Sequence, residues 1–221
     1  MTLQGNRAWM ALMALVLSAC VSAPSRPIVD DPDEVWQQRV NDLYNIDSWA
    51  IKGKLAVKTH QRGGQATMLW RRDRDVHNIN LYGPLGSGRV ILTQDQAGAT
   101  LRDNKKKTYH AATAEELLQR VAGWQVPFQS MRYWLLGVPR PGEDYEQSVD
   151  DWGRLQTLRQ SGWEVEYLEY KEFWGRELPR KFKMTALPGA VHSVDDQLDE
   201  NDQVRVKIII KSWQKLRIDS Q

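Results

Sequence analysis

The chain has 221 residues, and its 30 basic and 28 acidic side chains give a formal net charge of only +2. This near-neutral balance gives no reason to expect a nucleic-acid partner. One cysteine leaves no possibility of an internal disulfide or a cysteine-based metal site, so the folded domain must be stabilised by its core alone.

Residues 1–19 have the pattern of a signal peptide. Arg7 precedes an unbroken apolar run over residues 8–17. A membrane-spanning helix needs about 20 apolar residues, so this run predicts a signal-peptide core instead. Leu17, Ser18 and Ala19 lead to Cys20 in the arrangement of a lipobox, in which small side chains admit a signal peptidase and the thiol is acylated. We therefore predict cleavage before Cys20 and a lipid anchor on it; an ordinary secretory signal that ends near a cysteine is the alternative.

The segment that follows, residues 20–34, is predicted to be a flexible tether. It is rich in Pro, Ser and Asp and has no apolar period. Val21 occupies the position at which an Asp would retain a bacterial lipoprotein in the inner membrane, so we expect export to the outer membrane, with the domain facing the periplasm. Residues 35–221 are expected to form one domain, which opens with a short helix over about 33–44.

From Trp49 onward the apolar residues recur with period two, which indicates half-buried antiparallel strands. Trp49, Ile51, Leu55 and Val57 share one face, while Lys52, Lys54 and Lys58 share the other. The last strand is the clearest, with Val204, Val206, Ile208 and Ile210 opposite Arg205, Lys207 and Lys211. Further strands are predicted around residues 66–70, 79–81, 90–92, 99–101, 154–159, 163–170 and 181–184. No alternation of strands and helices appears, so a mainly β, antiparallel fold is expected and a parallel nucleotide-binding sheet is not.

Residues 113–139 interrupt the strands and are predicted to form a small helical cover. Thr113 and Glu116 have the spacing of a capping box, and an apolar stripe follows before Gly123. Ser130 is predicted to cap a second short helix over 131–136, which ends at Gly137.

No arrangement of residues predicts catalysis. The four histidines are scattered, and no pair of them has metal-ligand spacing. Gly86, Ser87 and Gly88 resemble a nucleophile elbow, but Leu85 stands where that motif needs glycine. Phosphate-binding motifs are also missing. We therefore expect a protein that is not an enzyme and needs no cofactor.

The connection from Tyr82 to Gly88 is unusual because Leu85 lies at its centre among glycines and a proline. By residue type alone, this leucine is more simply a side chain that folds onto the core or is exposed incidentally. The alternative is an apolar prong that enters lipid.

Short motifs along almost the whole mature chain resemble the LolB family of outer-membrane lipoprotein receptors (LolA/LolB-like). Each motif is weak alone, but they occur in the same order as in the family. They are the lipobox at 17–20, the opening strand with Trp49, Gly53, Leu55 and Val57, the pair Leu69 and Trp70, the segments 81–86, 114–118, 123–127, 134–139 and 160–167, the pair Leu178 and Pro179, and the closing strand to Trp213.

The resemblance implies a strongly curved, unclosed antiparallel β-barrel of about eleven strands, with a short helical lid at 113–139 over an apolar cavity. It also implies a non-catalytic, energy-independent receptor, which accepts the acyl chains of lipoproteins from the periplasmic carrier LolA and inserts them into outer-membrane lipid. In this family the leucine of the corresponding loop protrudes and serves membrane insertion, so Leu85 is expected to be a prong. The acidic run at 195–202 is longer than the family needs.

We expect the following strand and lid residues to line the acyl-chain cavity: Leu55, Met68, Trp70, Leu81, Leu92, Leu117, Leu118, Val121, Trp134, Tyr167 and Ile208. The competing hypotheses are a structural or adaptor lipoprotein with a filled interior and, less favoured, a lipid hydrolase. A monomer is expected because the chain has no coiled-coil repeat.

Overall fold

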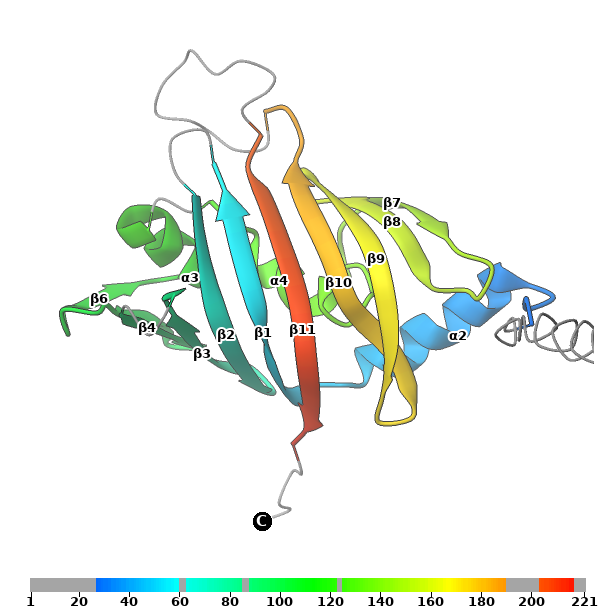
Figure 1. Cartoon of the computed structure of the whole chain (residues 1–221), viewed down its shortest axis with the longest axis horizontal. Helices are drawn as coiled ribbons and strands as arrows, with labels where there is room; N and C mark the ends of the chain where they lie inside the picture. The colour runs from blue at the N-terminus through cyan, green and yellow to red at the C-terminus, as the bar shows by residue number, and fades with distance from the viewer. Residues whose placement is uncertain (1–26, 60–62, 85–87, 123–124, 190–202, 217–221) are drawn as a thin grey trace, which may run out of the picture.

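The computed structural model describes residues 27–59, 63–84, 88–122, 125–189 and 203–216. They form one antiparallel sheet with short helices on one side of it (Figure 1). The strands are β1 (Ser48–Lys58), β2 (Gly63–Asp73), β3 (Val76–Tyr82), β4 (Arg89–Asp95), β5 (Gly98–Arg102), β6 (Thr108–Ala111), β7 (Tyr145–Val149), β8 (Leu155–Gln160), β9 (Trp163–Phe173), β10 (Arg176–Ala186) and β11 (Arg205–Lys215). The helical segments are α2 (Pro32–Tyr44), α3 (Ala114–Leu117), the π-helical turn η2 (Leu118–Ala122) and α4 (Phe128–Trp134).

The sheet has eleven strands in the order β6-β5-β4-β3-β2-β1-β11-β10-β9-β8-β7. Most neighbours in the sheet are therefore neighbours in sequence, and the pairing of β1 with β11 joins the first strand to the last. In this order β6 and β7 are the two edges of an unclosed, curled sheet. The predicted mainly β, unclosed antiparallel architecture is confirmed.

Strand β1 forms because its side chains alternate between core and solvent. Leu55 and Val57 are buried, while Lys54 and Lys58 are exposed. A register shift between Lys52 and Gly53 interrupts the pairing with β11. A Cβ atom on Gly53 would lie 2.5 Å from the carbonyl oxygen of Ile209, so only glycine fits at this close approach of the two strands.

Two strands, β6 and β7, are absent from the sequence prediction. Residues 108–111 and 145–149 are short, and none of their side chains is fully buried. Because both strands lie at edges of the sheet, they lack the apolar alternation that reveals a half-buried strand.

The helices follow local capping signals with one exception. Asp31 caps α2 by accepting a hydrogen bond of 2.9 Å from the amide of Glu34, and Thr113 caps α3 by accepting one of 3.2 Å from the amide of Glu116. The predicted cap at Ser130 is wrong, because α4 begins at Phe128 directly after Pro127. Instead, Ser130 Oγ lies 3.0 Å from Ser161 Oγ in the turn between β8 and β9.

Among the described residues, no helix has both the length and the apolar character required to cross a bilayer.

Candidate functional site

The described residues line a small, partly open apolar cavity between the concave side of the sheet and the helical cover, which we call the lid (residues 113–139). Its volume is about 40 Å³. Sheet strands supply most of the wall, and Leu118 of η2, Val126 and two residues of α4 complete it. The lining residues are all apolar: Leu55, Val57, Met68, Trp70, Ile79, Leu81, Leu92, Leu118, Val126, Phe128, Met131 and Val206.

Six of the eleven residues expected at the cavity lie in its wall: Leu55, Met68, Trp70, Leu81, Leu92 and Leu118. The other five belong to the surrounding core, where Leu117, Trp134, Tyr167 and Ile208 are buried and Val121 is partly buried. Sequence reasoning missed Phe128, because it started the second lid helix after that residue. It also missed Val126, which precedes α4, and Met131, which lay in the predicted helix but was not assigned to the cavity. It also missed Val57, Ile79 and Val206, although the alternation that selected Leu55, Leu81 and Ile208 places them on the same inward faces.

The lid is hydrogen-bonded to the sheet at the C-terminal end of α4. The indole Nε1 of Trp134 donates to Gln160 Oε1 at 3.0 Å, and the hydroxyl of Tyr167 donates to the carbonyl oxygen of Trp134 at 3.0 Å. Gln160 is itself fixed, since its Nε2 donates to the carbonyl oxygen of Arg140 at 2.8 Å. This end of α4 is therefore anchored on β8 and β9.

The N-terminal end of α4 rests on aromatic side chains. The Phe128 ring stacks on Trp70 of β2 and also meets the edge of His77 of β3. The Trp70 Nε1 donates to His77 Nδ1 at 3.2 Å. His77 Nε2 is buried and has no hydrogen-bond partner in the described part of the chain. These contacts hold the lid over the cavity by apolar packing.

Burial, together with the nearby cations Arg72 and Arg132, lowers the pKa of His77 to about 4. His77 is therefore neutral near pH 7. Burial also lowers the pKa of Arg72, whose guanidinium lies 5.9 Å from the ring centre of Tyr133 on α4.

The cavity is small for a hydrocarbon ligand. Sites for drug-sized ligands typically measure about 300–1,000 Å³, whereas this one measures about 40 Å³. Side chains fill most of the space that the sequence led us to expect to be hollow. The pocket therefore has room for only a small part of an acyl chain, and a whole chain can bind only if wall residues move.

Two predicted functional residues, Cys20 and Leu85, lie outside the described residues, as does the acidic run at 195–202. The flanks of the Leu85 connection are described: β3 ends at Tyr82, and the Gly83 amide donates to the Gly88 carbonyl oxygen at 3.1 Å. Within the described ranges, no group of three His, Cys, Asp or Glu side chains is placed to hold a metal ion.

Comparison with known proteins identifies the family of this chain. The family model described as "Outer membrane lipoprotein LolB" matches residues 47–213. The chain belongs to the LolB family. The match begins at the residue before β1 and ends at Trp213 in β11, so it includes residues of all eleven strands. Membership places the chain in lipoprotein localisation and not among enzymes.

Curated relatives agree over nearly the full chain. The outer-membrane lipoprotein LolB of Nitrosococcus oceani is 35% identical over 205 residues, which cover 92% of this chain and 94% of the relative. LolB of Pseudomonas savastanoi pv. phaseolicola is 34% identical over 211 residues, which cover 94% and 95% of the two chains.

Solved structures support the fold. A LolA superfamily protein from Nitrosomonas europaea aligns with a TM-score of 0.50 at 9% identity, covering 84% of this chain and 93% of that one. A DUF1329 family protein from Desulfovibrio piger also aligns with a TM-score of 0.50, at 4% identity, over 89% of this chain and 96% of that one. At such low identity the likeness concerns the fold alone.

Proposed function

We propose that this chain is a lipid-anchored receptor of the outer membrane, which accepts lipoprotein acyl chains from the periplasmic carrier LolA and releases them into the membrane. The observation that carries the proposal is the apolar cavity between the sheet and the lid. Its twelve lining residues include no polar side chain. Such a wall suits a hydrocarbon chain and offers nothing to a polar substrate.

The physical need for a receptor follows from the cost of exposing acyl chains to water. Each CH₂ group gains about 0.8 kcal/mol on burial, so a lipoprotein needs shelter throughout its passage. Entry of a whole acyl chain requires the N-terminal part of α4, with Phe128 and Met131, to move away from β2 and β3. This movement must also break the hydrogen bond from the Gln129 amide to Glu115.

Transfer needs no fuel under this proposal. A difference of about 1.4 kcal/mol between donor and receiver shifts the distribution of cargo about tenfold. A receiver that binds acyl chains somewhat better than the carrier therefore takes the cargo, and the bilayer then offers a still better site.

In this proposal the anchor is separate from the binding site. Residues 1–19 are the signal peptide, Cys20 carries the lipid, and the tether lets the single domain reach the periplasm. Helix α2 begins at Pro32, so the tether that we propose ends before it. We expect residues 21–221, which contain every described element, to bind acyl chains as a monomer without the anchor.

A fluorescent fatty-acid analogue, titrated into residues 21–221, tests the proposal. Saturable binding is expected. Val126→Phe should weaken it, because the larger ring fills the cavity from the lid side, where Val126 is part of the wall. Val149→Phe is the matched control, since Val149 packs against the core from β7 and is not part of the wall.

Absence of saturable binding would contradict the proposal and favour a structural or adaptor lipoprotein. Equal weakening by the two variants would also count against the cavity as the binding site.

A further inference from the structure

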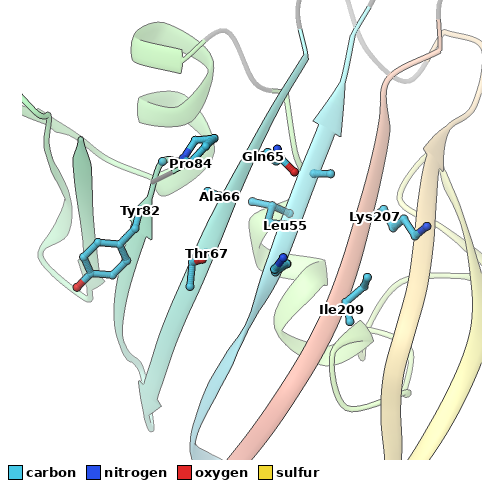
Figure 2. Close-up of a pocket in the computed structure, with 11 residues that line it drawn as sticks. Leu55, Gln65, Ala66, Thr67, Tyr82, Pro84, Lys207 and Ile209 are labelled. Atoms are coloured by element: carbon cyan, nitrogen blue, oxygen red, sulfur yellow. The ribbon is translucent and has the colours of Figure 1, made fainter. Parts of the chain in front are cut away.

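A groove of about 540 Å³ lies on the outer face of the sheet, on the other side of the strands from the lid. Figure 2 shows its side chains on β1, β2, β3 and β11. Lys54, Lys207, Gln65 and Thr67 supply polar atoms, while Ile209 and Pro84 supply apolar surface. Pro84 belongs to the connection between β3 and β4, so the groove adjoins the flank of the Leu85 loop.

Strand register places the groove residues in two rows across the sheet. Thr67 pairs with Lys54 on one side and with Tyr82 on the other, and Tyr82 pairs with Arg89. In the second row, Ala56 pairs with both Lys207 and Gln65. Because side chains alternate along a strand, these residues point away from the cavity that Val57 and Met68 line.

The lysines of the groove carry uncompensated charge. Lys54 and Lys207 are exposed, and in the described ranges neither forms an ion pair. On β9 and β10, by contrast, basic side chains form ion pairs. Lys183 Nζ lies 2.6 Å from a carboxylate oxygen of Glu166, and Arg180 pairs with Glu169.

Cross-strand pairing adds like charges to the same end of the sheet. Lys58 on β1 pairs with Arg205 on β11. Lys207 lies opposite Lys183, but the charge of Lys183 is already balanced by Glu166. Like charges placed directly opposite each other destabilise a sheet. An anion bound between β1 and β11 would relieve the repulsion between Lys58 and Arg205, so this end of the outer face is suited to a negatively charged partner.

We propose that this groove binds the phosphate headgroups of anionic phospholipids and orients the domain on the membrane surface. The lysines would contact phosphate, and Ile209 and Pro84 would lie against the glycerol and the first methylene groups. The headgroup layer of one leaflet is roughly 5–8 Å thick. Pro84 lines the groove and directly precedes Leu85. When Leu85 inserts into the membrane, the groove therefore lies at the depth of the headgroups. The inference rests on the membrane-insertion role that we expect for Leu85, and therefore on the proposed function.

Co-sedimentation of residues 21–221 with vesicles tests the groove. One set of vesicles contains phosphatidylglycerol and phosphatidylcholine, and the other contains phosphatidylcholine alone. We expect tighter binding to the anionic vesicles, and this preference should weaken as salt is raised. Each lysine near an anionic surface strengthens binding about fivefold, so the double substitution Lys54→Gln with Lys207→Gln should weaken it about 30-fold.

A charge-matched control is Lys171→Gln with Lys215→Gln. Lys171 lies near the β9–β10 hairpin, and Lys215 is the exposed last residue of β11, at the end of the sheet away from the groove. This control should keep most of the vesicle binding. Inorganic phosphate at millimolar concentration should not compete beyond its effect on ionic strength, because the partner is a lipid surface.

Equal loss in the two double variants, or unchanged binding by the Lys54 and Lys207 variant, would overturn the proposal. If that variant binds vesicles normally but loses cargo acceptance from LolA, the groove is a protein-docking surface instead. The Lys54 and Lys207 variant should bind the fluorescent fatty-acid analogue as tightly as the unchanged chain does. This measurement therefore separates a failure of the groove inference from a failure of the proposed function.

Discussion

The indole of Trp70 on β2 and the ring of Phe128 on the lid stack with centroids 4.9 Å apart and planes inclined by 13°. Both side chains are part of the cavity wall, and both are almost fully buried. This pair is therefore a direct link between the sheet and the part of the lid that must move when a ligand enters. Aromatic pairs contribute about 0.5–1.5 kcal/mol beyond their burial.

Phe128→Ala should make the cavity easier to enter. The variant should lose about 3–5 kcal/mol of folding stability, because a large buried ring is removed. It should nevertheless bind the fluorescent fatty-acid analogue roughly 2- to 10-fold more tightly, since the stacking energy no longer opposes opening. Urea denaturation and a binding titration on the same preparation measure the two effects.

Phe182→Ala is the control for that variant. Phe182 is fully buried on β10 against Tyr167 but is not in the cavity wall. A similar loss of stability without tighter binding is expected. Tighter binding in both variants would mean that general loosening of the core, and not the Trp70–Phe128 contact, controls entry.

Gly53→Ala should destabilise the sheet at its central pairing. The added methyl group would lie 2.5 Å from the Ile209 carbonyl oxygen, which belongs to the backbone and cannot rotate away. Overpacking of this kind costs about 1–3 kcal/mol. Thermal unfolding should show a lowered Tm, while Gly63→Ala, whose nearest neighbour would lie 3.6 Å away, should change it little.

Acid should destabilise the folded domain through His77. Its pKa is about 4 in the folded chain and 6.5 in the unfolded one. The unfolded state therefore binds the proton more readily, and stability is lost as pH falls from about 6.5 towards 4. Between pH 7.5 and pH 5 the free energy of unfolding should fall by about 2 kcal/mol from this group.

His77→Gln isolates that contribution in urea titrations at the two pH values. Glutamine can still accept the hydrogen bond from Trp70 but does not titrate, so the difference between pH 7.5 and pH 5 should shrink. An unchanged pH dependence would show that other groups are responsible.

The central strands could be predicted from the sequence because one face of each is buried, so that apolar and polar residues alternate along the strand. Strand β1 shows this directly: Lys52, Lys54 and Lys58 are exposed, while Leu55 and Val57 are buried. The edge strands β6 and β7 have no fully buried side chains and lack this alternation, so they were missed. The lid helix α4 was misplaced because a plausible cap, Ser130, lies within it and Pro127 precedes its true start.

The cavity could be predicted only in part. Alternation identifies which residues share a face, and this sufficed for Leu55, Met68 and Leu81. It does not show how far a curved sheet lies from its cover at each point. Tyr167 and Ile208 therefore share the inward side with Leu55 but are packed in the core beyond the cavity. The groove at Lys54 and Lys207 was also hidden, because it depends on the register between β1 and β11.

The proposed membrane prong gives the last prediction: Leu85→Glu should impair delivery of lipoproteins into liposomes but leave fatty-acid binding intact. A leucine buried in lipid contributes about 1.5–3 kcal/mol, so delivery should slow by about 10- to 100-fold. Leu168→Glu is the matched control, because Leu168 is an apolar side chain that is 48% exposed on β9. Normal delivery by the Leu85 variant, or equal slowing by both, would contradict a specific role of Leu85 in membrane insertion.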